Sequence, residues 1–105
     1  MSYNIDLQKI AEELEFDLED VEMLMDLFLE SVEDSMRALK EAIEENNFDK
    51  VYQCSHSIKG SSANLTLMDI SNKAQDIEHN ARESNHIDYL SKFSELKILI
   101  DNLNS

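Results

Sequence analysis

A histidine, a lysine and a glycine lie within about one turn of a predicted helix, at His56, Lys59 and Gly60. The chain contains this one glycine and no proline. Because glycine inside a helix costs about 1 kcal/mol relative to alanine, its place here needs a reason other than helix stability. Close approach by another backbone or another molecule is a common reason. With an imidazole and an ammonium group one turn apart, we expect the approaching molecule to be involved in chemistry.

Helices must position these residues, since apolar side chains recur at helical spacing along the chain and no segment alternates like a strand. The expected helices carry residues 5–14, 17–43, 47 to about 65 or 67, 70–81 and 87–103. Asp17 is the expected N-cap of the second helix, with Asp20 where a capping box usually has Glu or Gln, and Asn47 is the expected N-cap of the third. Short connections between long amphipathic helices predict an all-α fold. We expect an antiparallel four-helix bundle with a short extra N-terminal helix laid across it.

A helical wheel divides the third helix into two faces. Lys59 and Gly60 flank His56, and Ala63 and Tyr52 extend the same stripe, which is small, polar and directed away from the main core. Four residues of the opposite face are expected to face the core: Cys54, Ile58, Ser61 and Leu65.

The chain is strongly acidic, with a formal net charge of −14 and a pI near 4.3. Nucleic acid and anionic membranes both require a basic face, so we expect neither as a partner. The single cysteine excludes an internal disulfide framework and fits a reducing compartment. There is no basic-then-apolar leader and no apolar run of about 18 residues. We therefore expect one cytoplasmic domain covering residues 1–105.

Residues 56–65 read HSIKGSSANL. This run resembles the signature of histidine-containing phosphotransfer (HPt) domains, H-x-(L/I)-K-G-(S/A)-(S/A)-x-x-(L/I/F), which fixes the histidine, lysine and glycine at i, i+3 and i+4. The helix pattern extends the resemblance over nearly the whole chain. One departure is Thr66, where the family commonly has glycine after the Asn-Leu pair, and it bears on where the third helix ends.

The resemblance implies that His56 accepts a phosphoryl group from a receiver-domain aspartate or a histidine kinase and passes it to a response-regulator receiver domain. The implied partners are that receiver domain and an upstream hybrid or sensor histidine kinase. Lys59 would neutralise charge on the phosphoryl oxygens, and Gly60 would leave room for the partner's acidic pocket. We expect a monomeric carrier, not an enzyme. It would bind no metal or cofactor of its own, because the receiver domain would bind Mg²⁺.

A hairpin between the third and fourth helices would place Glu78 beside His56. If the turn centres near Leu67, the two residues are equally far from it along the chain. Glu78 could then accept a hydrogen bond from one ring nitrogen, leaving the other as the nucleophile. The family is similar, since a Gln or Glu on the next helix often holds the histidine. Glu78 could equally be one of many surface carboxylates.

The stretch from Ile77 to Arg82 resembles the family's L-E-x-x-A-R sequence and makes Arg82 a second cation near the docking face. Gln75 is expected level with Lys59. The residues predicted to contact the partner are Gly60, Ala63, Tyr52, Arg82 and Gln75. Further apolar contacts are expected from the N-terminal helix and the start of the second.

Other interpretations are simpler for several residues. His79 and His86 fit ordinary surface or boundary positions, and Lys59 could be a solvated lysine. Cys54 and His56 cannot share a metal ion, because they point about 200° apart on one helix. Among other classes, an acyl carrier protein would need an Asp-Ser-Leu site, which is absent, and an EF-hand would need an acidic loop with glycine. A complete histidine kinase would need an ATP-binding domain. A non-catalytic acidic adaptor or scaffold remains the alternative, and a phosphodonor test separates it from a carrier.

Overall fold

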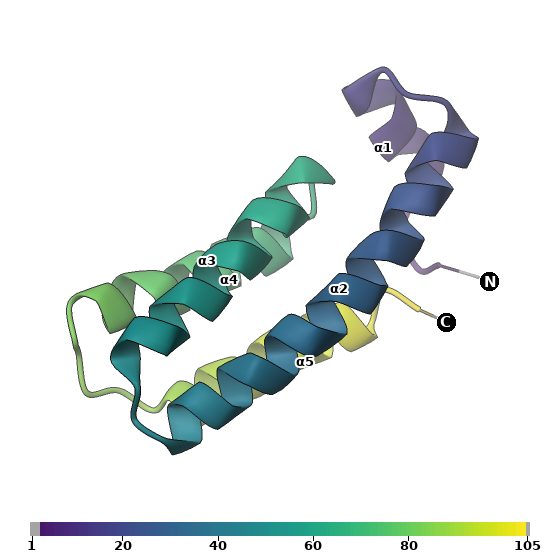
Figure 1. Cartoon of the computed structure of the whole chain (residues 1–105). Coiled ribbons are helices and arrows are strands. Elements are labelled where there is room, and N and C mark those ends of the chain that lie inside the picture. The colour runs from purple at the N-terminus through teal and green to yellow at the C-terminus, as the bar shows by residue number, and fades with distance from the viewer. Residues whose placement is uncertain (1–2, 105) are drawn as a thin grey trace.

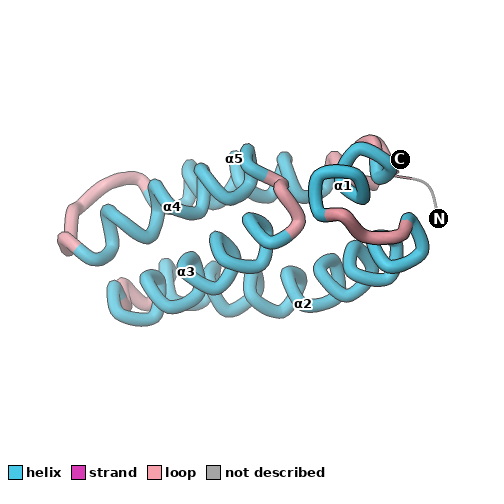
Figure 2. The backbone as a smooth tube through the Cα atoms, turned by 90° about the horizontal axis from the view of Figure 1, so that it is seen from above, coloured by secondary structure: helices cyan, strands magenta, loops and turns pink. Residues whose placement is uncertain are grey.

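Residues 3–104, the part of the chain that the computed structural model describes, contain five α-helices joined by short loops, and no strand occurs there. The helices are α1 (Leu7–Leu14), α2 (Leu18–Glu44), α3 (Phe48–Asn64), α4 (Met68–Arg82) and α5 (Tyr89–Asp101). Helices α2 to α5 form the bundle, and α1 lies at the end where α2 begins (Figures 1 and 2). The predicted all-α bundle is confirmed. Residues 1, 2 and 105 of the predicted domain lie outside the described part.

Helix α2 sets the long dimension of the molecule. Its 27 residues span about 40 Å at about 1.5 Å per residue, which matches the longest extent of 42 Å. Its buried face packs against α3 and α5. The α3–α4 pair has the most extensive contact in the structure. None of the described helices is both long and apolar enough to cross a membrane.

Small side chains allow α3 and α4 to pack closely. Ser55, Ser62 and Ala74 are fully buried between the helices and Ser71 nearly so. The Ser55 and Ser62 hydroxyls donate to carbonyls one turn earlier in α3, at 2.7 and 2.6 Å, so their burial leaves no polar group unpaired. The Ser71 hydroxyl crosses instead to the Lys59 carbonyl at 3.1 Å. This bond joins the start of α4 to α3 and helps to fix the register of the two helices.

The predicted core face of α3 is partly wrong. Ile58 is buried as expected, but Cys54 and Ser61 are only half-buried, and their neighbours Ser55 and Ser62 face the core in their place. The physical reason is that the buried face of α3 is rotated about the helix axis toward Ser55 and Ser62, which moves Cys54 and Ser61 to its edge. Serine can occupy such a position because its hydroxyl bonds to its own helix.

The helix starts follow the capping expectations in part. Asn47 caps α3 as predicted, accepting from the Lys50 backbone N–H at 3.2 Å. Asp17 occupies the N-cap position of α2 but its side chain accepts no capping hydrogen bond, so that part of the prediction is wrong. Asp6 and Asp88 cap α1 and α5, so these helices begin two residues later than predicted.

Four helices end in the left-handed region without a glycine. The positive-φ residues are Glu15, Asn46, Thr66 and Ser84, which follow α1 to α4 in turn. After α3, the Thr66 N–H bonds to the Ala63 carbonyl and the Leu67 N–H to the Ser62 carbonyl, the two bonds of a Schellman motif. Helix α3 therefore ends at Asn64. The family's glycine position is the one at which this chain has Thr66 with φ 59°.

The two ends of the described chain are bound together. The Asn4 backbone N–H donates to the Leu103 carbonyl at 2.9 Å. The Asn4 side-chain amide donates to the carbonyls of Asn102 and Asn104, at 2.7 and 3.0 Å. Figure 1 places both ends on the same side of the bundle, beside α2.

Replacing Thr66 by glycine should stabilise the fold. A β-branched side chain is strained at positive φ, whereas glycine is not, so we expect Thr66→Gly to raise the free energy of unfolding by about 1 kcal/mol. Asn46→Gly is the matched control and should gain less, because asparagine tolerates this region. Urea unfolding of the three proteins measures both. A Thr66→Gly variant no more stable than the native protein would show that Thr66 is not strained.

Candidate functional site

His56 lies near the middle of α3 with its side chain 58% exposed. The ring of Tyr52, one turn earlier, stacks on the imidazole with centroids 5.8 Å apart and 15° between the planes. Gly60 and Ala63 continue the exposed stripe along α3. The structure thus brings Tyr52, His56, Gly60 and Ala63 onto one outward face, as the helical wheel predicts.

Glu78 of α4 contacts the imidazole. Its Oε2 atom lies 3.1 Å from His56 Nδ1, so the contact predicted from the hairpin geometry is present. The Glu78 side chain is only 8% exposed, in contrast to the many solvated carboxylates of this chain. A buried carboxylate that bonds to an exposed imidazole fixes the orientation of that ring.

Lys59 binds the same carboxylate. Its Nζ atom lies 3.0 Å from Glu78 Oε1 and 2.9 Å from Oε2. The sequence did not predict this ion pair, since it placed Gln75 beside Lys59. Gln75 is exposed on α4 and makes no hydrogen bond with Lys59 within residues 3–104. The signal was available, because Lys59 is one turn from His56 and a lysine side chain is long enough to reach the carboxylate that contacts the histidine.

The ionisation of Glu78 decides which ring nitrogen carries the proton. Burial raises the pKa of Glu78, but the hydrogen bonds and charges of Lys59 and His56 outweigh that effect, so its pKa is lowered. An ionised carboxylate only accepts hydrogen bonds. The Nδ1 atom of His56 must therefore donate, which leaves the lone pair of a neutral ring on the exposed Nε2 atom.

Gly60 is not required by the packing of the chain. A Cβ atom built at this position would meet no atom of the described residues within 4 Å. Its backbone is helical, with no positive φ. Close approach by another part of the chain is therefore excluded within residues 3–104 as the reason for the glycine.

An open apolar groove adjoins the far end of the exposed stripe. It has a volume of about 510 Å³ and lies between α1, the first half of α2 and the end of α3. Its lining comprises Leu14, Phe16, Leu24, Leu27, Phe28, Ser31, Ser61, Asn64 and Leu65. Phe16 and Leu27 are about half-exposed, at 49% and 55%. The groove lies beside the N-terminal helix and the start of the second, the segments from which the sequence predicts apolar contacts with a partner.

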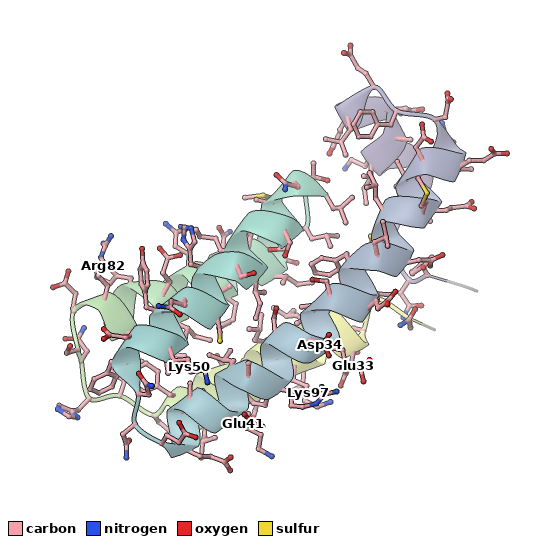
Figure 3. All side chains as sticks on the ribbon, in the orientation of Figure 1. Glu33, Asp34, Glu41, Lys50, Arg82 and Lys97 are labelled. Atoms are coloured by element: carbon pink, nitrogen blue, oxygen red, sulfur yellow. The ribbon has the colours of Figure 1, made fainter. Side chains whose placement is uncertain are left out.

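Arg82 projects outward from the C-terminal end of α4 (Figure 3). It makes no ion pair with any described residue. Lys59 differs, because its charge is paired with Glu78. The two cations predicted near the docking face, Lys59 and Arg82, therefore have different surroundings. The other two histidines, His79 and His86, are exposed, and His86 packs edge-on against Phe48.

Comparisons with known proteins agree with this fold. The Hpt domain family matches residues 23–105, and the chain belongs to that family. Hpt domains are histidine phosphotransfer modules of phosphorelays. The fold is also similar to the crystal structure of histidine-containing phosphotransfer protein B (HptB) from Pseudomonas aeruginosa PAO1. That match has a TM-score of 0.78 and 20% sequence identity, and covers 90% of this chain and 80% of that one. A search of curated proteins gave no match.

The pairing of Glu78 should make stability depend on acid pH. Because the pKa of Glu78 is lowered in the folded state, its stabilisation is fully present above its ordinary pKa of 4.5 and is lost as the pH falls through the folded pKa. Glu78→Gln should cost about 1 kcal/mol at pH 7. It should also lose less stability than the native protein between pH 5 and pH 3.

Urea unfolding across this pH range is the measurement, and Glu95→Gln is the control. Glu95 also binds a lysine, Lys73, at 2.7 Å, but on an exposed surface where solvent screens the pair. The Glu95→Gln variant should stay closer to the native pH profile than Glu78→Gln. Identical profiles for native protein and Glu78→Gln would contradict the coupling.

Proposed function

We propose that this chain is a cytoplasmic histidine phosphocarrier in which His56 is the phosphoryl acceptor. The contact between His56 Nδ1 and the buried Glu78 carboxylate carries the proposal, because it leaves a nucleophilic Nε2 atom exposed. The open space at Gly60 leaves the approach to that atom unobstructed. Membership of the Hpt domain family supports the same reaction.

Acceptance is a displacement at phosphorus. The Nε2 lone pair of His56 attacks the phosphoryl group of a receiver-domain acyl phosphate. An N–P bond forms, the P–O bond to the aspartate breaks, and the aspartate leaves as a carboxylate. The Nδ1 proton stays on the ring, hydrogen-bonded to Glu78, and the ring gains a positive charge. Lys59 provides a cation for the phosphoryl oxygens.

Donation is the reverse displacement. A receiver aspartate attacks phosphorus, and the imidazole leaves as a neutral group because Nδ1 has kept its proton. Glu78 thus acts in both directions, because its hydrogen bond keeps one proton on Nδ1 of the ring. Mg²⁺ would be bound by the receiver domain and not by this chain, and a sensor or hybrid kinase would supply the phosphoryl group upstream.

The receiver domain would dock over His56 and along the apolar groove. Gly60 and Ala63 keep the face flat between the histidine and the groove, and Tyr52, Gln75 and Arg82 would contact the partner on the other side. The whole chain has a formal net charge of −14, and the charge of Lys59 is neutralised by Glu78. Apolar contact therefore supplies most of the docking energy. Arg82 supplies the cation whose charge no described residue neutralises.

His56→Gln should fold normally and accept no phosphoryl group. Loading with phosphoramidate, a small donor with a P–N bond, followed by mass mapping of the modified residue, tests this. The adduct on native protein should be acid-labile and alkali-stable. His79→Gln is the matched control and should load like the native protein. Label mapping to His79 or His86, or label on His56→Gln, would refute the assignment and favour an adaptor without phosphotransfer.

Gly60 is expected to serve docking and not folding. Gly60→Ala should raise the free energy of unfolding by about 1 kcal/mol, since the site is helical and open. Ala63→Gly, on the same exposed face, should lower it by a similar amount. Gly60→Gln should slow transfer to a receiver domain by about tenfold, which corresponds to about 1.4 kcal/mol of lost docking energy.

Phosphoramidate separates docking from chemistry in this test. Because the donor is small, Gly60→Gln should load from it at the native rate. Transfer from loaded protein is then timed with a receiver domain that accepts the group from the native chain. A Gly60→Gln variant that transfers at the native rate would remove the role of the glycine in docking.

A further inference from the structure

The Glu78 carboxylate binds two donors at once. Its Oε2 atom lies 2.9 Å from Lys59 Nζ and 3.1 Å from His56 Nδ1, and its Oε1 atom lies 3.0 Å from the same lysine. With the imidazole neutral, one positive and one negative charge cancel within this cluster. Nothing in the resting cluster requires Lys59 to leave the carboxylate.

Phosphorylation changes this balance of charge. When Nε2 attacks the donor, the ring keeps its Nδ1 proton and becomes an imidazolium, while a dianionic phosphoryl group is added on the far nitrogen. The cluster then contains two cations, the ring and Lys59, and two anionic groups, Glu78 and the phosphoryl oxygens. The favourable arrangement pairs Glu78 with the imidazolium it already touches and pairs Lys59 with the phosphoryl group.

We propose that Lys59 changes partner in each transfer cycle, held by Glu78 while His56 is free and by the phosphoryl group while His56 carries it. This inference rests on the proposed phosphotransfer function. Glu78 accepts the Nδ1 proton of His56 in both states, and on phosphorylation the imidazolium replaces the lysine as the cation that neutralises it. The phosphoryl group therefore gains a cation only by taking it from a carboxylate, which limits how strongly this chain holds the group.

The mobility that the exchange needs belongs to Lys59 alone. Its side chain is 27% exposed on a flexible stem, whereas Glu78 is 8% exposed and enclosed between α3 and α4. The Lys59 backbone is fixed, because its carbonyl accepts the Ser71 hydroxyl at 3.1 Å. Only the end of the side chain has to move. Among the described residues, Glu78 is the one acid bonded to Lys59, so no second carboxylate competes for it.

A double-mutant cycle on phosphoryl loading tests the exchange. Each protein is equilibrated at one fixed ratio of phosphoramidate to ammonium, and the phosphorylated-to-free ratio is read by intact mass. His56 Nε2 takes the phosphoryl group and the P–N bond of the donor breaks to release ammonia, so atoms and charge balance. The contribution of Lys59 is then a quotient of two such ratios. It is the phosphorylated-to-free ratio of the protein that has the lysine, divided by that of the same protein with Lys59→Met.

In the native background this contribution should be small, because Lys59 leaves an ion pair to reach the phosphoryl group. In the Glu78→Gln background the amide oxygen still accepts the Nδ1 proton but holds the lysine weakly. The contribution of Lys59 should then be about fivefold larger. The exposed pair of Lys73 and Glu95 is the matched control. Lys73→Met should leave the phosphorylated-to-free ratio unchanged, both in the native background and in the Glu95→Gln background. An equal or smaller contribution of Lys59 without Glu78 would overturn the exchange.

NMR of the native protein gives a readout that needs no variant. On phosphorylation, the side-chain Nζ signal of Lys59 should move and show coupling to ³¹P, and the carboxyl carbon of Glu78 should shift. The corresponding signals of Lys73 and Glu95 should stay in place. Lys59 signals that are unchanged on phosphorylation would refute the proposal. If native protein does not load at His56 at all, the proposed function fails, whereas loading without exchange refutes only this inference.

Discussion

A single buried carboxylate organises the site. Glu78 is enclosed between α3 and α4, and burial of an unpaired carboxylate would be costly, so it needs donors within reach. His56 and Lys59 supply them from adjacent turns of α3. These contacts with Glu78 fix the orientation of the His56 ring and keep its proton on Nδ1. They also determine where the Lys59 ammonium group lies when His56 is free. The electrostatic cost of burying one charge thus sets the chemistry of the exposed nitrogen.

The register of α3 against α4 brings these groups together. Small buried side chains let the two helices approach closely, and the Ser71 hydroxyl bonds across to the Lys59 carbonyl. A shift of α4 by one residue would rotate Glu78 by about 100° and remove it from the imidazole. The serines of α3 therefore act in function as well as in packing, because the close contact they permit keeps the carboxylate level with the histidine.

The sequence predicted the helices and the exposure of His56 from helical periodicity, and from a symmetric hairpin it gave the contact with Glu78 as one of two alternatives. It did not predict the pairing of Lys59 with Glu78, which depends on where a long flexible side chain finds its partner. It also assigned Cys54 and Ser61 to the core, because a wheel drawn from one helix does not show how that helix is rotated against its neighbours. Asp17 shows a third limit, since a suitable residue at an N-cap position need not make the capping bond.

The joining of the chain ends has a consequence for protein architecture. Asn4 binds the backbone at Leu103 and Asn102, so the bundle begins and ends at nearly the same point. A domain of this kind can be inserted into a surface loop of a host protein without stretching the loop, and it tolerates circular permutation when its ends are linked. The histidine, midway along α3, would remain free to meet a partner in such a fusion. The domain can therefore be fused or inserted into other proteins without a change in its own fold.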